Sequence, residues 1–521
     1  MKVCYSKYAA ALRASRPAIQ SKVLTNSSRP SFLYSTLGQR AMSSSTVRYG
    51  DFPKELPGDD PDDVQFSSLY GVRTVELNRP KKLNSLNGSM VRKILPRLRE
   101  WEKSDMANIV MISGAGPKAF CAGGDVAELA EQNKKGPEGQ KASADYFALE
   151  YKLDLLIATL SKPYIAVMDG ITMGGGVGLS VHAPFRIATE KTVFAMPETT
   201  IGFFPDVGGS FFLSRLDGEI GTYLALTSER LLGVQAFYAG IATHYLDSSL
   251  LQQLTTRLSE LTFKDYMPLN ERLQIINSTI SEFTNDLPTP DSYEKAQYGN
   301  LTGTLREAID RVFKFDSVEE ILSALSKEVE SSDAKIAEWA KATEKTIALR
   351  SPTSLRVTLR QLREGKNWNI RETFIREHKM AAEFMAHPDF TEGVSARLIN
   401  KPPTKPQWKP DTLAQVSKED VDKFFQIPTP EETIELIPSY PGSPAPEYTE
   451  YPHAIFSLPR ESDIEAVVNK VGSKGAGAIL AEVLRKWNNK AGVKEKVEDV
   501  LARNTKEVKG VIQWGQPAPR L

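Results

Sequence analysis

Three short segments of the chain carry residue types and spacings that suit chemistry on a carbonyl oxygen. They are AFCAGGD at residues 119–125, GITMGGGVGL at residues 170–179 and MPETTIGFFPDVGG at residues 196–209. Glycine lets a backbone N–H approach a ligand without a Cβ in the way, and a turn from strand to helix leaves unpaired amides at the helix start. Two such turns that converge would place two N–H donors on one oxygen, which is an oxyanion hole. Tight strand–helix packing is the alternative explanation for each glycine-rich turn.

The third segment adds two carboxylates, Glu198 in a Pro-Glu-Thr turn and Asp206 further along the same loop. Apolar residues flank Glu198, so we expect its carboxylate to be desolvated and its pKa to be raised. A raised pKa makes a carboxylate a better general base near neutral pH. Asp206 would then orient a polar group of the substrate or share the proton; the alternative is a pair of surface acids in a turn. The apolar neighbours are Phe194, Met196, Phe203 and Phe204.

These segments lie among alternating strand and helix patterns. Apolar alternation and short apolar runs predict strands over residues 72–77, 108–113, 164–168 and 185–189. An amphipathic helix is predicted over residues 89–103 and a second helix over 142–160, and a small-residue helix follows the glycine triplet at 174–176. Strands that alternate with helices indicate an α/β layer architecture with much parallel pairing.

The second half of the chain has a different pattern. Residues 317–400 read as nearly continuous helix, and a Pro/Lys stretch at 402–410 precedes a short helix that ends near Phe425. Proline recurs densely between residues 428 and 452, which is typical of a linker. Residues 461–508 are expected to form two or three short, mildly basic helices.

Composition excludes several classes of protein. Lysine plus arginine equals aspartate plus glutamate at 65 each, so net charge does not indicate a nucleic-acid or membrane partner. The longest apolar stretch, residues 165–181, is too short and too interrupted to span a bilayer. Two cysteines cannot build a disulfide framework, and the five histidines form no metal-binding motif. The glycine segments also lack the spacing of nucleotide-binding loops.

The first 45 residues differ from the rest because they are basic and serine-rich and contain no Asp or Glu. This composition is typical of a mitochondrial presequence, and it indicates a protein of the mitochondrial matrix. A basic tail without a targeting role is the alternative. We therefore exclude residues 1–45 from the predicted fold.

The three segments, in this order and spacing, resemble the crotonase (enoyl-CoA hydratase/isomerase) superfamily, and they are most similar to its 3-hydroxyisobutyryl-CoA hydrolase branch. The motif HPDFTEG at residues 387–393 extends the resemblance, which covers about residues 60 to 425. The resemblance implies an α/β fold with a crotonase-like ββα superhelix core at residues 46–316. A helical region at 317–425 would complete this domain, and a proline-rich linker with a helical extension would occupy 426–521 as a separate tail.

The resemblance also implies roles for individual residues. The amides of Gly124 and Gly175 would form the oxyanion hole, and Glu198 matches the catalytic carboxylate of the branch. Asp206 matches its partner, and Glu150 matches an acid that contacts the substrate. Glu198 would either attack the thioester or activate water; the sequence does not distinguish these roles.

The implied reaction is hydrolysis of 3-hydroxyisobutyryl-CoA, or of a close β-hydroxyacyl-CoA, in valine catabolism. CoA would be part of the substrate, and no metal or redox cofactor is expected. Fungal relatives of this branch are also components of the small subunit of the mitochondrial ribosome, so ribosomal protein and rRNA are possible partners, with residues 427–521 as the docking part. An enoyl-CoA hydratase or isomerase is the third reading, which Gly178 disfavours because a hydratase carries its second catalytic glutamate there.

Two further residues near the segments invite a catalytic reading but suit a structural one better. Cys121 is expected to be a small packed side chain rather than a nucleophile. His182, which follows the glycine-rich helix, has no acid and nucleophile near it in sequence, so we expect a structural role.

Overall fold

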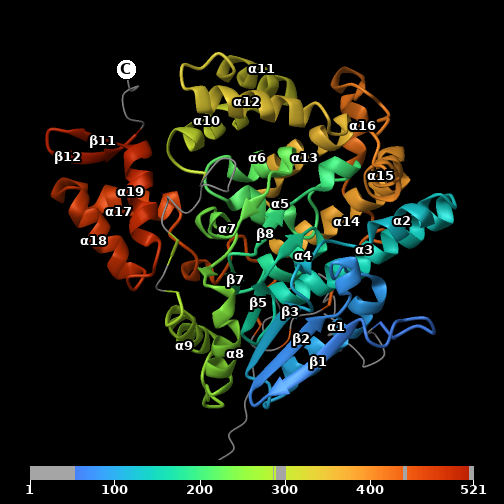
Figure 1. The fold of residues 1–521 in the computed structure, drawn as a ribbon, viewed down its shortest axis with the longest axis horizontal. Helices are drawn as coiled ribbons and strands as arrows, with labels where there is room; N and C mark the ends of the chain where they lie inside the picture. Colours follow the sequence, from blue (N-terminus) through green and yellow to red (C-terminus); the bar gives the residue numbers. More distant parts are fainter. Residues whose placement is uncertain (1–52, 285–286, 289–300, 438–439, 441–442, 516–521) are drawn as a thin grey trace, which may run out of the picture. The chain divides into compact units, whose positions relative to one another are not determined.

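The computed structural model describes residues 53–284, 287–288, 301–437, 440 and 443–515 (Figure 1). The predicted presequence at residues 1–45 lies outside the described residues. Among the helices of the described part, none combines the length and apolarity that crossing a membrane requires.

A six-stranded sheet forms the base of the first half of the described chain, with strand order β1-β2-β3-β5-β7-β10. β1 pairs antiparallel with β2, and the remaining neighbours pair in parallel. All five residues of β5 are buried, as expected for a parallel strand covered on both faces. The four strands predicted from the sequence are present with boundaries shifted by at most one residue. The six strands are β1 (Val64–Leu69), β2 (Val72–Leu77), β3 (Ile109–Gly114), β5 (Tyr164–Met168), β7 (Phe185–Ala188) and β10 (His244–Tyr245).

A second, four-stranded sheet positions the three glycine and carboxylate segments. Its order is β4-β6-β8-β9, in which β4, β6 and β8 pair in parallel and β9 pairs antiparallel with β8. Because the carboxyl ends of parallel neighbours lie at the same edge of a sheet, the residues that follow β4, β6 and β8 meet there. These strands were not predicted from the sequence. They are β4 (Ala119–Cys121), β6 (Ile171–Met173), β8 (Val193–Ala195) and β9 (Leu231–Leu232).

Helices connect and cover the two sheets. The helices predicted over residues 89–103 and 142–160 are present as α1 and α3, although α3 begins five residues earlier than predicted. α1 packs Met90, Ile94 and Leu98 in one cluster with strand residues such as Val110 and Ile112. The predicted small-residue helix is α4. The helices are α1 (Gly88–Lys103), α2 (Val126–Asn133), α3 (Pro137–Ala158), α4 (Gly175–Val181), α5 (Gly209–Phe212), α6 (Ile220–Thr227), α7 (Val234–Tyr238), α8 (Leu251–Ser259) and α9 (Leu269–Ser281).

The predicted helical region is confirmed as a run of helices beside α3. Phe374, Met380 and Phe384 of α14 share a core cluster with Phe147 and Tyr151 of α3. Because helices already predominate from α8 onward, the change from strands to helices precedes the predicted boundary at residue 317, and the domain boundaries stay predictions. The helices are α10 (Gly303–Phe313), α11 (Val318–Glu328), α12 (Ala334–Ile347), α13 (Pro352–Gly365), α14 (Ile370–Ala386), α15 (Pro388–Val394), the π-helical η6 (Ser395–Ile399) and α16 (Lys418–Phe424).

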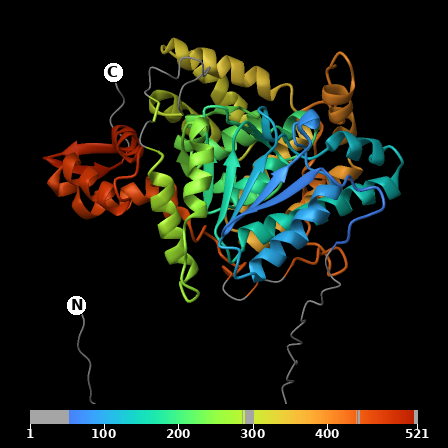
Figure 2. The same cartoon turned by 60° about the horizontal axis from the view of Figure 1, so that its bottom comes forward.

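We call residues 426–515 the C-terminal extension. Its proline-rich start packs Ile434, Leu436, Tyr448 and Tyr451 against the large core cluster rather than hanging free. Three helices and a hairpin follow as one group (red in Figures 1 and 2). The prediction of helix up to residue 508 was wrong at its end, because the β-branched residues of 505–514 pair as strands around a Lys-Gly turn with positive φ. The elements are α17 (Glu461–Val471), α18 (Ala476–Lys486), α19 (Val493–Asn504), β11 (Thr505–Val508) and β12 (Val511–Trp514).

Candidate active site

The structure brings all five predicted site residues onto one cavity of about 470 Å³. Its floor is the edge of the second sheet where β4, β6 and β8 end, and helix α3 contributes one wall. The residues predicted from the sequence that line it are Gly124, Glu150, Gly175, Glu198 and Asp206.

The amides of Gly124 and Gly175 are neighbours with unused N–H groups. An ideal Cβ on Gly175 would lie 3.4 Å from the Gly124 nitrogen. Leu86 pairs with the residues around Gly124, since its N–H donates to Gly123 O at 2.8 Å and its carbonyl accepts from Asp125 N at 2.8 Å. Among the described residues, neither glycine amide donates a hydrogen bond. The bonds of Leu86 use the carbonyl of Gly123 and the N–H of Asp125 and leave the N–H of Gly124 unused. Gly175 is the first residue of α4, so its N–H has no partner within the helix. Two free donors therefore face the cavity side by side.

Glu198 begins the short helix η2 (Glu198–Ile201) directly after β8 and is 5% exposed. Its Oε1 would lie 3.1 Å from a Cβ on Gly174, and its Oε2 has no hydrogen-bond partner among the described residues. Burial, followed by the charge of Asp206, raises the pKa of Glu198 well above its ordinary value. The desolvated carboxylate that the sequence predicted is therefore present, next to the glycine turn.

Asp206 is also buried and is held by a hydrogen bond. The Tyr151 hydroxyl of α3 donates to its Oδ2 at 2.8 Å. Burial raises the pKa of Asp206 to about 7, although the bond from Tyr151 opposes the shift. Asp206 is thus poised to change its charge near neutral pH.

The loop around Asp206 is strained, because Val207 has φ 52° and Gly208 has φ 85°. Glu377 of α14 stabilises it by accepting hydrogen bonds from Gly208 N at 2.7 Å and Ser210 N at 2.8 Å. Gln361 of α13 donates to the Pro205 carbonyl at 2.5 Å. These helices therefore fix the position of the carboxylate.

A second support of the Asp206 loop runs from the C-terminal extension through His182. The Nε2 of His182 lies 2.8 Å from the Val207 carbonyl, which can only accept, so Nε2 carries the proton. Burial lowers the pKa of His182 to about 4, so its ring is neutral and Nδ1 is an acceptor. The Tyr451 hydroxyl donates to that Nδ1 at 2.8 Å. The expected structural role of His182 is confirmed.

Four residues that support the site from distant parts of the chain were not predicted from the sequence: Tyr151, Glu377, Gln361 and Tyr451. Glu377 had a local signal, because it interrupts the apolar stripe of α14 at helical spacing from Phe374 and Met380. The other three residues lie in patterns that give no sign of their partners.

Glu150 and Asp154 lie one helical turn apart on α3, and both are buried. Burial is the main cause that raises the pKa of each well above its ordinary value. A Cβ on Gly178 would lie 2.8 Å from both carboxylate oxygens of Asp154 and 2.8 Å from the Val207 Cβ. The position at which a hydratase carries its second glutamate therefore has no room for a side chain here.

The same cavity has a positively charged part that no motif in the sequence predicts. Arg230, Arg350 and Arg397 line it, and the buried Nε atoms of Arg350 and Arg397 have no hydrogen-bond partner among the described residues. Burial, followed by the charge of Arg397, lowers the pKa of Arg350 to about 10. Two desolvated guanidinium groups that repel each other are suited to an anionic group of a ligand.

Cys121 lies behind the glycine turn and is fully buried. Burial raises the pKa of its thiol to about 12, so the thiolate needed for nucleophilic attack is not formed at neutral pH. The expected packing role of Cys121 is confirmed.

Comparison with known proteins gives consistent results. Residues 72–425 match the family described as enoyl-CoA hydratase/isomerase. The small ribosomal subunit protein mS47 of Neurospora crassa is 50% identical over 512 residues, which cover 96% of this chain and 98% of that protein. The mitochondrial 3-hydroxyisobutyryl-CoA hydrolase of Danio rerio is 44% identical over 363 residues, which cover 70% of this chain and 89% of that protein.

Among solved structures, a carnitinyl-CoA dehydratase from Mycobacterium thermoresistibile superposes with a TM-score of 0.60 at 33% sequence identity. The match covers 72% of this chain and 99% of that chain. The fold class predicted from the sequence is confirmed.

Proposed function

The chain belongs to the enoyl-CoA hydratase/isomerase (crotonase) family, and on that basis we propose that it hydrolyses 3-hydroxyisobutyryl-CoA, or a close β-hydroxyacyl-CoA, to the free hydroxy acid and CoA. One observation carries the proposal. Two unused amide donors lie beside the buried carboxylate of Glu198, while Gly178 leaves no room for the second glutamate of a hydratase.

In the proposed reaction the thioester oxygen binds between the amides of Gly124 and Gly175. The tetrahedral intermediate places negative charge on that oxygen, and two fixed N–H donors in a buried site stabilise it more than water does. This stabilisation acts on the transition state, so it raises kcat rather than binding alone.

Glu198 supplies the nucleophile in one of two ways. It either attacks the acyl carbon and forms an anhydride that water then cleaves, or it takes a proton from water that attacks directly. In both cases the C–S bond breaks, the oxygen of water ends in the acid, and CoA leaves as the thiolate and takes up a proton. Its raised pKa makes the Glu198 carboxylate a stronger base and nucleophile when ionised.

Asp206, held by Tyr151, is proposed to bind the β-hydroxyl of the substrate, and Glu150 is proposed to contact the acyl group. A site built to bond a hydroxyl rejects analogues that lack it, because its polar groups are then left unpaired. The arginines Arg350 and Arg397 suit the phosphates of CoA. The proposed reaction requires no metal or redox cofactor.

The pH dependence of the reaction offers one prediction. Hydrolysis needs ionised Glu198, so the rate rises with pH on the acidic limb. The negative charge of Asp206 raises the pKa of Glu198, so Asp206→Asn is expected to move this limb to lower pH. The measurement is the pH profile of kcat for each variant.

Asp154→Asn is the matched control, since Asp154 is equally buried but is not among the groups that shift Glu198. An acidic limb at unchanged pH in Asp206→Asn, or a limb moved equally by both variants, would show that Asp206 does not control the base.

The bond from Tyr451 to His182 gives another prediction. Tyr451→Phe leaves Nδ1 of His182 without its donor, which loosens the Val207 carbonyl and the adjacent Asp206. Because sub-ångström placement governs catalysis, we expect kcat/KM for the hydroxylated substrate to fall about tenfold, and more than for isobutyryl-CoA. The measurement is kcat/KM for both substrates.

Tyr448→Phe is the control, because that hydroxyl comes from the same extension but donates to Ala158 O, away from the loop. If the two variants lose activity equally, or if Tyr451→Phe keeps full discrimination between the substrates, His182 does not transmit the effect.

The second candidate function is a structural role in the small subunit of the mitochondrial ribosome, in addition to catalysis. Its support is the extent of similarity, since mS47 matches 96% of the chain and the Danio rerio hydrolase matches 70%. The family match ends at Phe425, so residues of the C-terminal extension would contact ribosomal protein or rRNA. Co-sedimentation with the small subunit tests this role, and its absence from purified subunits would reject it.

An enoyl-CoA hydratase or isomerase activity is the third candidate, and the absence of space at Gly178 disfavours it. For all three we propose the mitochondrial matrix as the location, in line with the names of the related proteins. The hydrolase proposal is tested by CoA release from 3-hydroxyisobutyryl-CoA compared with isobutyryl-CoA, which lacks the hydroxyl.

A further inference from the structure

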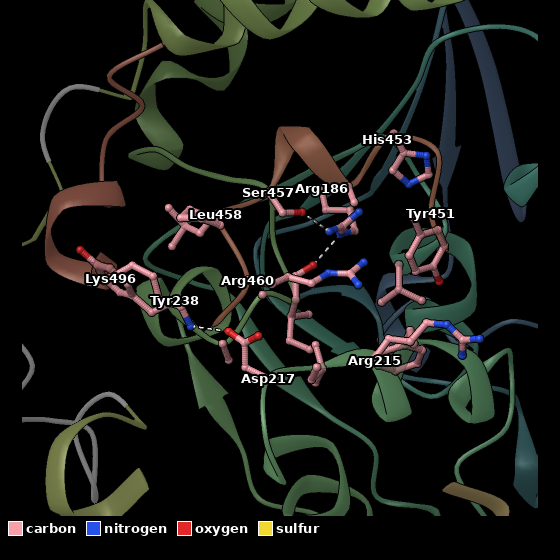
Figure 3. A pocket seen from close by; sticks show the side chains of 18 residues that line it. Arg186, Arg215, Asp217, Tyr238, Tyr451, His453, Ser457, Leu458, Arg460 and Lys496 are labelled. Atoms are coloured by element: carbon pink, nitrogen blue, oxygen red, sulfur yellow. Dashed lines mark hydrogen bonds and ion pairs between the residues drawn. The ribbon is translucent and has the colours of Figure 1, made fainter. Parts of the chain in front are cut away.

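A second cavity, of about 70 Å³, lies where the C-terminal extension meets the described residues up to Phe425, which we call the catalytic region. We call this cavity the seam cavity. None of the five catalytic-site residues lines it. Figure 3 shows Arg186, Arg215 and Asp217 from the catalytic region facing side chains from the extension. The polar residues from the extension are Tyr451, His453, Ser457, Arg460 and Lys496.

Arg186, in β7, brings a buried positive charge to this cavity. It is 6% exposed and donates to the carbonyls of Ala183 at 2.8 Å and Ile241 at 2.6 Å and to the Ser457 hydroxyl at 3.0 Å. Within the part of the chain that the structure describes, no carboxylate forms an ion pair with it. Burial lowers its pKa to about 10, so it is still a cation at neutral pH.

The other charges near the seam cavity do not neutralise Arg186. Asp217 is engaged by Lys496, with 2.7 Å between Oδ2 and Nζ. Glu450 is engaged by Arg460 at 2.6 Å, and its side chain is 59% exposed. The carboxylates nearby are therefore already paired, and the buried guanidinium is left with neutral partners.

Two further buried polar groups near Arg186 also lack a hydrogen-bond partner among the described residues. One is the Nε2 of His453, a residue that lines the cavity. The other is the Nζ of Lys490, which does not line the cavity but is close enough to be influenced by the charge of Arg186. Burial, followed by the charge of Arg186, lowers the pKa of Lys490 to about 7. A buried cation without a counter-charge is costly, so this arrangement is suited to an anion from outside the chain.

We propose that the seam cavity binds one phosphate group, either free phosphate or a phosphate monoester, between Arg186 and Arg460. Guanidinium groups match the geometry of phosphate oxygens, and His453 Nε2 can donate a further hydrogen bond. The volume holds a single group of this size. Since one arginine belongs to the catalytic region and the other to the extension, the phosphate holds the two together.

The experiment measures binding of inorganic phosphate to the full chain by calorimetry, with thermal unfolding in phosphate and in sodium chloride of equal ionic strength. Phosphate is expected to raise Tm by about a few degrees beyond chloride, because a ligand that binds only the folded state stabilises it. A parallel titration with adenosine monophosphate shows whether the ligand is a phosphate monoester or free phosphate. Binding and a rise in Tm equal to those with phosphate indicate that monoesters bind, whereas no binding indicates that only free phosphate does.

Three variants locate the binding. Arg460→Gln is expected to weaken phosphate binding about tenfold or more. Arg485→Gln, which removes an arginine paired with Glu482 on the surface of α18, is expected to leave it unchanged. Arg397→Gln removes a positive charge of the catalytic cavity and is expected to leave phosphate binding at the seam cavity, and the rise in Tm that it causes, unchanged.

A fourth variant supplies the missing charge. Ser457→Asp places a carboxylate at the position that Arg186 contacts, so we expect a higher Tm without phosphate and no further rise with it. A phosphate effect no larger than that of chloride would overturn the proposal. So would a full phosphate response in both Arg460→Gln and Ser457→Asp, because binding would then lie elsewhere.

Discussion

Replacing Glu198 by glutamine is expected to reduce CoA-thioester hydrolysis by at least about 10²–10⁴-fold while the protein stays folded. Glutamine has nearly the same shape, but it can neither attack the acyl carbon nor accept a proton from water. At neutral pH an ionised carboxylate at this buried position destabilises the fold, because its pKa is raised above the unfolded value. The neutral amide removes that cost, so we expect Tm to stay equal or to rise.

The measurement is kcat under saturating substrate, with Tm recorded for the same samples. Glu190→Gln is the matched control, since that glutamate accepts hydrogen bonds from Ser248 on an exposed turn outside the cavity. Activity within a few-fold of the unchanged protein in Glu198→Gln would remove Glu198 from the reaction.

Gly175→Ala carries the second large expected effect. The new Cβ would lie 2.5 Å from Glu150 Oε1 and 3.4 Å from the Gly124 nitrogen, in the space between the two proposed donors. The thioester oxygen would then lose at least one amide contact, and loss of one such donor costs about 10²–10³ in kcat. The measurement is kcat and KM of this variant for 3-hydroxyisobutyryl-CoA.

Gly477→Ala provides the control for a glycine substitution. Gly477 lies in α18, and no atom lies within 4 Å of its ideal Cβ, so we expect unchanged activity and slightly higher stability. A folded Gly175→Ala protein with normal kcat would mean that these amides do not stabilise the intermediate. Tm and circular dichroism of Gly175→Ala separate this outcome from misfolding.

The residues of the cavity could be predicted from the sequence more readily than the strands that position them. Glu198, Asp206 and the glycine turns lie in short motifs whose composition packing does not explain. By contrast β4, β6 and β8 have three residues each, too few to show an alternating pattern. Their parallel pairing is set by tertiary packing, so the convergence of the three segments followed only from the structure and from the family resemblance.

The supports of the Asp206 loop were the least predictable part. Glu377 and Gln361 come from helices more than 150 residues further along the chain. Their hydrogen bonds depend on how α13 and α14 pack against the loop, which no local pattern encodes. Tyr451 lies in a proline-rich stretch that the sequence predicted to be a linker, yet its ring packs on the core and its hydroxyl reaches His182.

The sequence and the structure give complementary information about Gly178. The family resemblance indicated that the second glutamate of a hydratase is replaced by Gly178. The structure adds the physical reason, because the carboxylate of Asp154 and the side chain of Val207 occupy the space that a side chain at this position would need. Reintroducing a glutamate would therefore require both neighbours to move.

The central claim is that this chain cleaves a β-hydroxyacyl-CoA thioester. The most direct test is the appearance of free CoA thiol when the full chain is mixed with 3-hydroxyisobutyryl-CoA, followed with a thiol reagent. We predict turnover that yields CoA and the hydroxy acid in equal amounts, with isobutyryl-CoA a much poorer substrate. Folded protein that releases no thiol from 3-hydroxyisobutyryl-CoA would contradict the hydrolase function and would leave the ribosomal role as the better candidate.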